Sequence, residues 1–163
     1  MGFSVIPVVG KDPAPGVFGF DKWAEDKQPE ETVDRFEKIK ATGWALVTTW
    51  KTVVALDIDS VSADILAVCP PSPCAKVGRR GETRFYRGGP WFNQKRKFFR
   101  KNTGDPESGK NKEGIELFCN GAYVVMPPSL HPETNLPYTW NGRPLDSIDI
   151  EELPELTLDD VDK

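Results

Sequence analysis

The chain has little cysteine, a single histidine and no long hydrophobic run, and each shortage excludes a class of protein. Three cysteines are too few, and odd in number, for a scaffold stabilised by disulfides. No stretch approaches the ~20 apolar residues that cross a membrane, and the first residues lack the charged and then apolar plan of a signal peptide. The sequence therefore predicts a reduced, cytoplasmic protein with no membrane partner.

The same shortage argues against a zinc site. Cys69, Cys74, Cys119 and His131 are the Cys and His side chains that zinc would need, and their spacing differs from that of known zinc motifs. The run Pro70-Pro71-Ser72-Pro73 also restricts the segment between the first two cysteines. We therefore expect ordinary thiols and no zinc.

Positive charge is concentrated in one part of the chain. The net charge is -4, yet residues 76–112 contain 12 Lys and Arg against three acids, a local charge of +9. Aromatic residues alternate with these cations, a composition that suits a phosphate backbone and stacked bases. A solvated hairpin with buried aromatics is the alternative interpretation. The predicted DNA-binding residues are Arg84, Arg87, Lys95, Arg96, Lys97, Arg100 and Lys101.

Length and patterning predict one α+β domain over residues 1–163, with a central antiparallel or mixed sheet flanked by helices. Two hairpins are expected, one formed by strands 83–87 and 95–99 and one formed by strands 115–119 and 123–126 around Asn120-Gly121. From residue 145 the chain becomes acidic, and this tail is predicted to be either the start of a helix or a linker. Further elements are expected at 3–9, 44–47 and 53–58 (strands) and at 30–40 and 63–68 (helices).

One predicted strand carries two carboxylates on a single face. In the run 53–59, Val54, Leu56 and Ile58 point one way, whereas Asp57 and Asp59 point the other. Positions i and i+2 lie roughly 6.5–7 Å apart along a strand, so two such carboxylates can share hard divalent cations. The alternative is a solvated pair of aspartates at a strand end, before a helix that begins near Ser60.

Glu116 is a candidate third acid. Its side chain lies on the opposite strand face from Ile115 and Leu117. If its strand neighbours the Asp57 strand, three carboxylates converge and can bind two metal ions roughly 3.5–4 Å apart. The alternative is an acid on an edge strand that faces water.

Five blocks in this order resemble the Prim-Pol domain of the archaeo-eukaryotic primase superfamily, in its phage or mobile-element type. The blocks are 2–13, with Gly10-Lys11-Asp12-Pro13; 55–59; 75–87; 115–118; and 124–140, with Pro127-Pro128-Ser129-Leu130-His131-Pro132. The resemblance implies a primase-polymerase fold with an RRM-like catalytic core. It also implies that Asp57, Asp59 and Glu116 are the catalytic residues and hold two Mg²⁺ or Mn²⁺ ions.

The chain departs from the family at the second motif, where members often have a histidine that holds the phosphates of the nucleotide. Thr83 stands at that position. Either phosphate binding passes to Arg79, Arg80 or Arg84 with Thr83 donating a hydrogen bond, or triphosphate binding is impaired. The predicted nucleotide-binding residues are Lys76, Arg79, Arg80, Thr83, Ser129 and His131.

These observations predict a template-dependent nucleotidyltransferase, a DNA primase and polymerase. Its substrates would be nucleoside triphosphates, a single-stranded DNA template and a primer strand. The first alternative is a catalytically weak nucleic-acid- or nucleotide-binding module of a replication protein that works with a helicase. The second is a metal-dependent nuclease that uses the same three acids.

Overall fold

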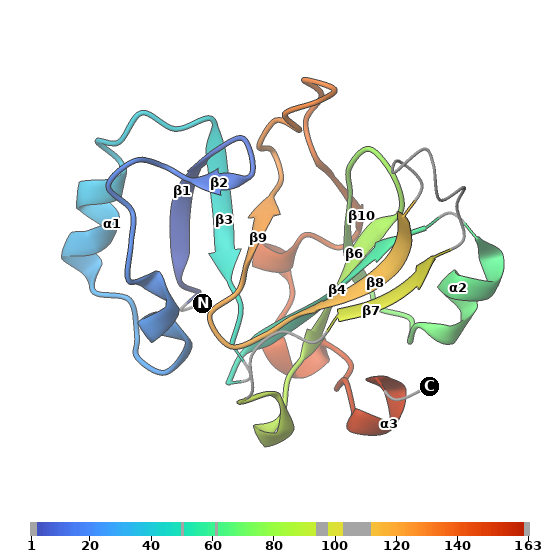
Figure 1. Ribbon diagram of the computed structural model, residues 1–163. Coiled ribbons are helices and arrows are strands. Elements are labelled where there is room, and N and C mark those ends of the chain that lie inside the picture. The colour runs from blue at the N-terminus through green and yellow to red at the C-terminus, as the bar shows by residue number, and fades with distance from the viewer. Residues whose placement is uncertain (1–2, 50, 61, 94–97, 103–111, 162–163) are drawn as a thin grey trace.

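The computed structural model describes residues 3–49, 51–60, 62–93, 98–102 and 112–161. Figure 1 shows two sheets side by side, with helices on their outer faces. The strand orders are β2-β1-β3-β9 in the four-stranded sheet and β10-β5-β6-β4-β8-β7 in the six-stranded sheet, and the strand pairs are antiparallel. The predicted α+β class is confirmed, with the strands divided between two sheets.

The four-stranded sheet packs its outer face against the N-terminal helices. Its strands are β1 (Val5–Val9), β2 (Asp12–Pro13), β3 (Gly43–Val47) and β9 (Tyr123–Met126). The 3₁₀ helix η1 (Phe20–Ala24) and the helix α1 (Glu30–Phe36) cover this face. Trp23 and Phe36 are buried there against Ile6 and Val8, so one apolar cluster joins these helices to the sheet.

The six-stranded sheet is built around β4 (Val53–Asp59), which pairs with β6 (Glu82–Arg87) on one side and β8 (Lys112–Phe118) on the other. Beyond them lie β5 (Cys74–Val77), β10 (Thr139–Gly142) and β7 (Phe98–Asn102). Val54, Leu56 and Ile58 are buried with residues of α2 (Ala63–Val68) and α3 (Leu158–Val161). The predicted alternation along this strand is therefore confirmed.

The opposite face of β4 meets the four-stranded sheet. Val53 and Ala55 are buried with Phe85 from β6 and with Leu46 and Val124 from the other sheet. Apolar packing thus fills one end of the space between the sheets. Asp57 and Asp59 follow at the other end of the same face of β4, because side chains two residues apart share a face.

The hairpin predicted for residues 115–126 is wrong, although its turn forms. Asn120 and Gly121 have the positive φ angles, 43° and 86°, that such a turn requires. The turn then bonds to the β3–β4 connection: Thr48 donates to the carbonyl of Ala122, and Gly121 donates to the carbonyl of Thr48. The two connections run together between the sheets, so β8 pairs with β4 and β9 pairs with β3.

The hairpin predicted for strands 83–87 and 95–99 is also wrong. β6 lies between β4 and β5, whereas β7 begins at Phe98 and pairs with β8. Residues 95–97 lie outside the described residues. The two predicted strands do not pair because β4, which is apolar on both faces over most of its length, lies between them in the sheet. β4 separates β6 from β8, and β7 pairs with β8.

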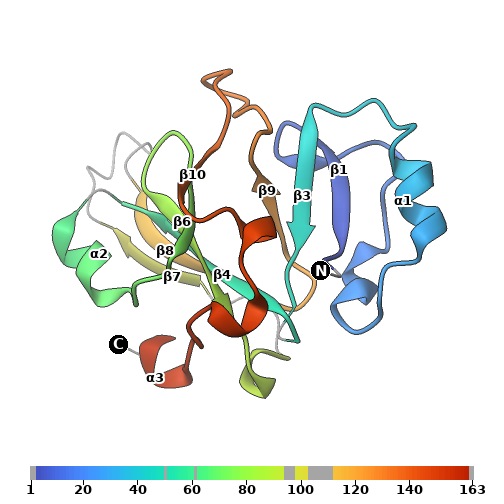
Figure 2. The same cartoon turned by 180° about the vertical axis from the view of Figure 1, so that it is seen from behind.

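The acidic tail is packed against the domain. It forms η3 (Leu145–Ser147), η4 (Ile150–Glu152) and α3, and Figure 2 shows it in red. The side chains of Ile148, Leu153 and Leu156 are buried. The tail also bonds to β6, because Arg87 donates to the carbonyl of Pro154 and Leu156 donates to that of Arg87. Over its described residues this segment is therefore not a free linker.

Candidate active site

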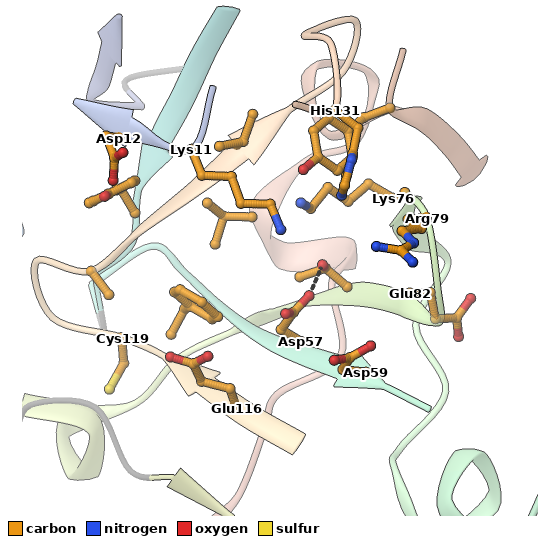
Figure 3. A pocket seen from close by; sticks show the side chains of 18 of the residues that line it. Lys11, Asp12, Asp57, Asp59, Lys76, Arg79, Glu82, Glu116, Cys119 and His131 are labelled. Atoms are coloured by element: carbon orange, nitrogen blue, oxygen red, sulfur yellow. Dashed lines mark hydrogen bonds between the residues drawn. The ribbon is translucent and has the colours of Figure 1, made fainter. Parts of the chain in front are cut away.

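A pocket of about 860 Å³ lies between the two sheets, at the polar end of the space that separates them. The six-stranded sheet supplies one wall, including Asp57 and Glu116. Lys11 reaches the pocket from the β1–β2 turn and Asp12 from the start of β2, whereas His131 and Tyr138 reach it from the segment before β10. Residues that are distant in the sequence thus meet at one place (Figure 3).

Strand register places four polar side chains in a row along this wall. Lys76 on β5 pairs with Thr83 on β6, Thr83 with Asp57 on β4, and Asp57 with Glu116 on β8. Directly opposite residues of antiparallel strands point to the same face. The row therefore reads ammonium, hydroxyl, carboxylate and carboxylate across four neighbouring strands.

Asp59 extends the acidic end of the row. It lies two residues beyond Asp57 on the same face of β4 and pairs with Gly114 on β8, so no side chain stands opposite it. Asp59 is exposed, whereas Asp57 and Glu116 are half-buried. The sequence predicted three neighbouring carboxylates if the strand of Glu116 lies next to that of Asp57. The two strands are neighbours in the sheet.

The donor set fits hard divalent cations in its chemistry. Carboxylate oxygens are the side-chain ligands that Mg²⁺ prefers. Seven carboxylates and four Lys or Arg side chains line the pocket, so added positive charge would be stabilised there. The carboxylates do not converge on one point: Asp57 faces Thr83, and Glu116 points away along its strand (Figure 3). Across the described residues, no group of three Cys, His, Asp or Glu side chains is arranged to hold an ion.

Lys76 forms the cationic side of the pocket. Its side chain is buried, and its Nζ lies 4.3 Å from the centre of the Tyr138 ring, a cation–π contact. Burial lowers the pKa of Lys76 to about 8; the charge of Asp57 opposes this effect and that of Lys11 adds to it. The ammonium group is therefore present at neutral pH but easily lost above it.

His131 packs against Tyr138, the residue whose ring also contacts Lys76. Its ring lies 5.4 Å from that of Tyr138, and its Nδ1 accepts a hydrogen bond of 3.2 Å from the backbone of Glu133. Burial lowers the pKa of His131, and neighbouring positive charges lower it further. A neutral imidazole whose Nδ1 accepts carries its proton on Nε2. Arg79, at the rim of the pocket, forms an ion pair with Glu133.

The pocket brings together most of the residues predicted for nucleotide and metal binding. They are Asp57, Asp59, Lys76, Arg79, Arg80, Thr83, Glu116 and His131. Ser129 is not among the lining residues. It is buried, and its hydroxyl bonds to the backbone of Trp44, accepting at 2.9 Å and donating at 3.2 Å. Its position thus joins the 127–132 loop to β3.

The predicted DNA-binding residues are scattered. Arg84 pairs with Leu56 on the other face of the sheet, where its guanidinium donates to the carbonyls of Leu66, Cys69 and Pro70. Arg87 forms an exposed ion pair of 3.2 Å with Glu155. Arg100 and Lys101 lie on β7, next to β8, and Lys95, Arg96 and Lys97 lie outside the described residues.

Lys11 and Tyr138 are among the pocket residues that were not predicted as site residues. Both lie inside blocks that carry the family resemblance, so the signal was present in the sequence. Gly10 has a φ of 65°, which glycine adopts readily in a tight turn. Lys11 follows it and reaches toward the centre of the pocket (Figure 3).

No curated protein matches the chain. In the part of the chain that the structure describes, no helix is both long enough and apolar enough to span a membrane. The family model described as "Bifunctional DNA primase/polymerase, N-terminal" (Prim-Pol) matches residues 1–156, which include both sheets and the whole pocket. The chain therefore belongs to the Prim-Pol family, whose members are nucleotidyltransferases of the DNA primase and polymerase type.

Proposed function

We propose that this domain is a template-dependent nucleotidyltransferase that adds nucleotides to a primer on single-stranded DNA, with Mg²⁺ or Mn²⁺ as cofactor. The observation that supports this most strongly is the row across the six-stranded sheet. Asp57 and Glu116 lie opposite each other at one end, and Lys76 lies at the other. Such a row offers separate places for metal ions and for phosphates.

The carboxylates and the cations have different tasks in this proposal. Asp57, Asp59 and Glu116 would hold two divalent ions, which when bound lower the pKa of the attacking 3′-hydroxyl and offset the charge of the triphosphate. Lys76 and Lys11 would neutralise phosphate oxygens. Because the three carboxylates repel a triphosphate, we expect nucleotide binding at this end of the pocket to depend on the divalent cation.

The basic segment is the proposed path of the DNA. β7 carries Arg100 and Lys101 and is the strand next to β8, on which Glu116 lies. In register, Phe98 pairs with Glu116 and Arg100 with Gly114. The backbone of this basic strand therefore runs about one strand spacing, roughly 5 Å, from the strand that carries Glu116, and we expect the template or primer to pass along this edge of the sheet.

The test is primer extension on a primed single-stranded template with Mn²⁺ or Mg²⁺. Asp57→Asn, Asp59→Asn and Glu116→Gln remove one charge each with little change in shape. Asp64→Asn is the matched control, because Asp64 is an exposed acid on α2 that does not line the pocket. We expect extension by the wild type and the control, and a loss of at least about 100-fold in the other three. Full extension by Asp57→Asn would refute the proposal.

One observation favours the second candidate, a nucleic-acid- or nucleotide-binding module that acts with a helicase. Among the described residues, the three carboxylates do not converge on a common point. Binding of single-stranded DNA by the wild type, with neither extension nor strand cleavage at any Mn²⁺ concentration, would support this second function. Cleavage of DNA without added nucleotides would instead indicate a nuclease.

A further inference from the structure

Thr83 is hydrogen-bonded to Asp57, and its side chain is buried. The two residues are directly opposite on β6 and β4, and the Thr83 hydroxyl donates a hydrogen bond of 2.5 Å to Asp57 Oδ1. Thr83 is 2% exposed although it lines the pocket. Its branched side chain has few allowed rotamers, so the hydroxyl is held in place.

This hydrogen bond conflicts with a role for Thr83 in binding phosphate. A threonine hydroxyl has one proton, and phosphate oxygens at neutral pH mainly accept hydrogen bonds. While that proton is donated to Asp57, Thr83 has none to donate to a nucleotide. The partner of the Thr83 hydroxyl proton in this chain is therefore Asp57 and not a phosphate.

The partner of Thr83 needs a fixed orientation. Asp57 has Glu116 directly opposite on its other side, and like charges opposite each other across strands repel. A donor on the β6 side holds one oxygen of Asp57 and leaves the second oxygen for a cation. Removing a group that orients a metal ligand in this way typically weakens metal affinity by about 10- to 100-fold.

Thr83 also separates the two ends of the row. Lys76 lies on its far side, so Lys76 and Asp57 are two strand spacings apart, roughly 10 Å. A charged residue at position 83 would place another full charge between them. The small neutral hydroxyl keeps Lys76 available for phosphate and Asp57 available for metal.

We infer that Thr83 is a positioning residue that sets the carboxylate of Asp57 for divalent-cation binding, and that it is not a nucleotide ligand. The inference rests on the proposed function, because it assumes that Asp57 holds a cation. It assigns phosphate binding to the cations that line the pocket, Lys11, Lys76, Arg79 and Arg80, without Thr83.

The test is Mn²⁺ binding to the complete chain without nucleotide, followed by the electron paramagnetic resonance signal of free Mn²⁺. Thr83→Val removes the hydroxyl and keeps the shape, and Thr83→Ser keeps the hydroxyl. We expect Thr83→Val to bind Mn²⁺ about 10-fold or more weakly, and Thr83→Ser to bind close to the wild type. In extension assays at saturating Mn²⁺, the nucleotide KM of Thr83→Val should equal that of the wild type.

The outcomes separate this inference from the proposed function. Mn²⁺ binding by Thr83→Val equal to the wild type, with a raised nucleotide KM, would overturn the inference and leave the metal site intact. Mn²⁺ binding by the wild type no tighter than by Asp57→Asn would overturn the metal site and this inference together. If Thr83→Val melts below the assay temperature, Thr83→Ala provides the same comparison.

Discussion

The ammonium group of Lys76 lies over the ring of Tyr138, 4.3 Å from its centre. Tyr138 in turn contacts His131, and a Cβ atom on Gly78 would lie 2.7 Å from the Tyr138 ring. The ring is thus held from two sides and fixes the place of the ammonium. Because this site is buried, it lowers the pKa of Lys76 to about 8, which gives the pocket a measurable pH dependence.

Nucleotide affinity is expected to fall as the pH rises through about 8. Below that pKa Lys76 is charged and can bind phosphate; above it the charge is lost. Losing one charge-assisted hydrogen bond weakens binding by about 10- to 100-fold. The measurement is the nucleotide Kd between pH 7 and pH 9.5 with a dideoxy-terminated primer, which cannot react, so that only binding is observed.

The control for this prediction is Lys76→Arg, whose guanidinium stays charged over the whole range. Its Kd should change little between pH 7 and pH 9.5. A wild-type profile as flat as that of Lys76→Arg would show that the charge of Lys76 does not contribute to nucleotide binding.

Arg84→Met is expected to destabilise the fold without altering DNA binding. Arg84 donates to three carbonyls that follow or end α2 and forms a 2.6 Å ion pair with Glu82, and its side chain is 14% exposed. Removing this donor from Glu82 and from the three carbonyls should cost about 2–4 kcal/mol in the free energy of unfolding, measured by urea titration.

Arg87→Met is the matched control for Arg84→Met. The ion pair of Arg87 with Glu155 is exposed, so its removal should cost about 0–1 kcal/mol in the free energy of unfolding.

The affinity of Arg84→Met for single-stranded DNA, and the dependence of that affinity on salt, should equal those of the wild type. A stable Arg84→Met protein with a reduced salt dependence would instead make Arg84 a phosphate contact.

The arrangement around Arg84 was partly readable from the sequence. Side chains alternate along a strand, so a residue that follows Thr83 directly must face away from it. If Thr83 faces the site, Arg84 must face the other side of the sheet. The alternation of side chains along one strand is enough to predict this. The same alternation correctly separated Leu56 and Ile58 from Asp57.

Strand order was not readable in the same way. The register of Asp57 with Glu116 joins residues 59 positions apart in the sequence, and nothing local to either strand specifies it. Asn120-Gly121 shows the limit clearly: the turn is local and was predicted, whereas the pairing of β8 and β9 depends on contacts with β3 and β4. The turn residues do not specify which strands β8 and β9 pair with; packing between distant parts of the chain does.

Leu156→Ala is expected to show that the acidic tail contributes to stability. Leu156 is fully buried beside Tyr86 and Leu117 in the cluster beneath the six-stranded sheet. Replacing a buried leucine by alanine costs about 2–5 kcal/mol. Leu158→Ala, at a position 43% exposed, should change stability by less than about 0.5 kcal/mol. Equal and small effects of both substitutions in urea unfolding would mean that the tail is not part of the core.

Gly81→Ala is expected to disturb the acidic end of the row, because Gly81 passes very close to β4. A Cβ atom at this position would lie 1.8 Å from the carbonyl oxygen of Ile58 and 3.0 Å from the nitrogen of Ser60, on either side of Asp59. Gly81 also has a φ of 61°, which is unfavourable for alanine by about 1–2 kcal/mol. Alanine must therefore move the backbone that carries Asp59.

Gly16→Ala is the control that separates the backbone cost of a positive φ from the steric contact with β4. Gly16 has a φ of 87° and no atom within 4 Å of the Cβ position, so this substitution has only the backbone cost of about 1–2 kcal/mol. We expect Gly16→Ala to keep Mn²⁺ binding and primer extension. Gly81→Ala should lose more stability and bind Mn²⁺ more weakly, measured by thermal unfolding and by the signal of free Mn²⁺. If the two variants behave alike in both measurements, the close approach of Gly81 to β4 does not determine where Asp59 lies.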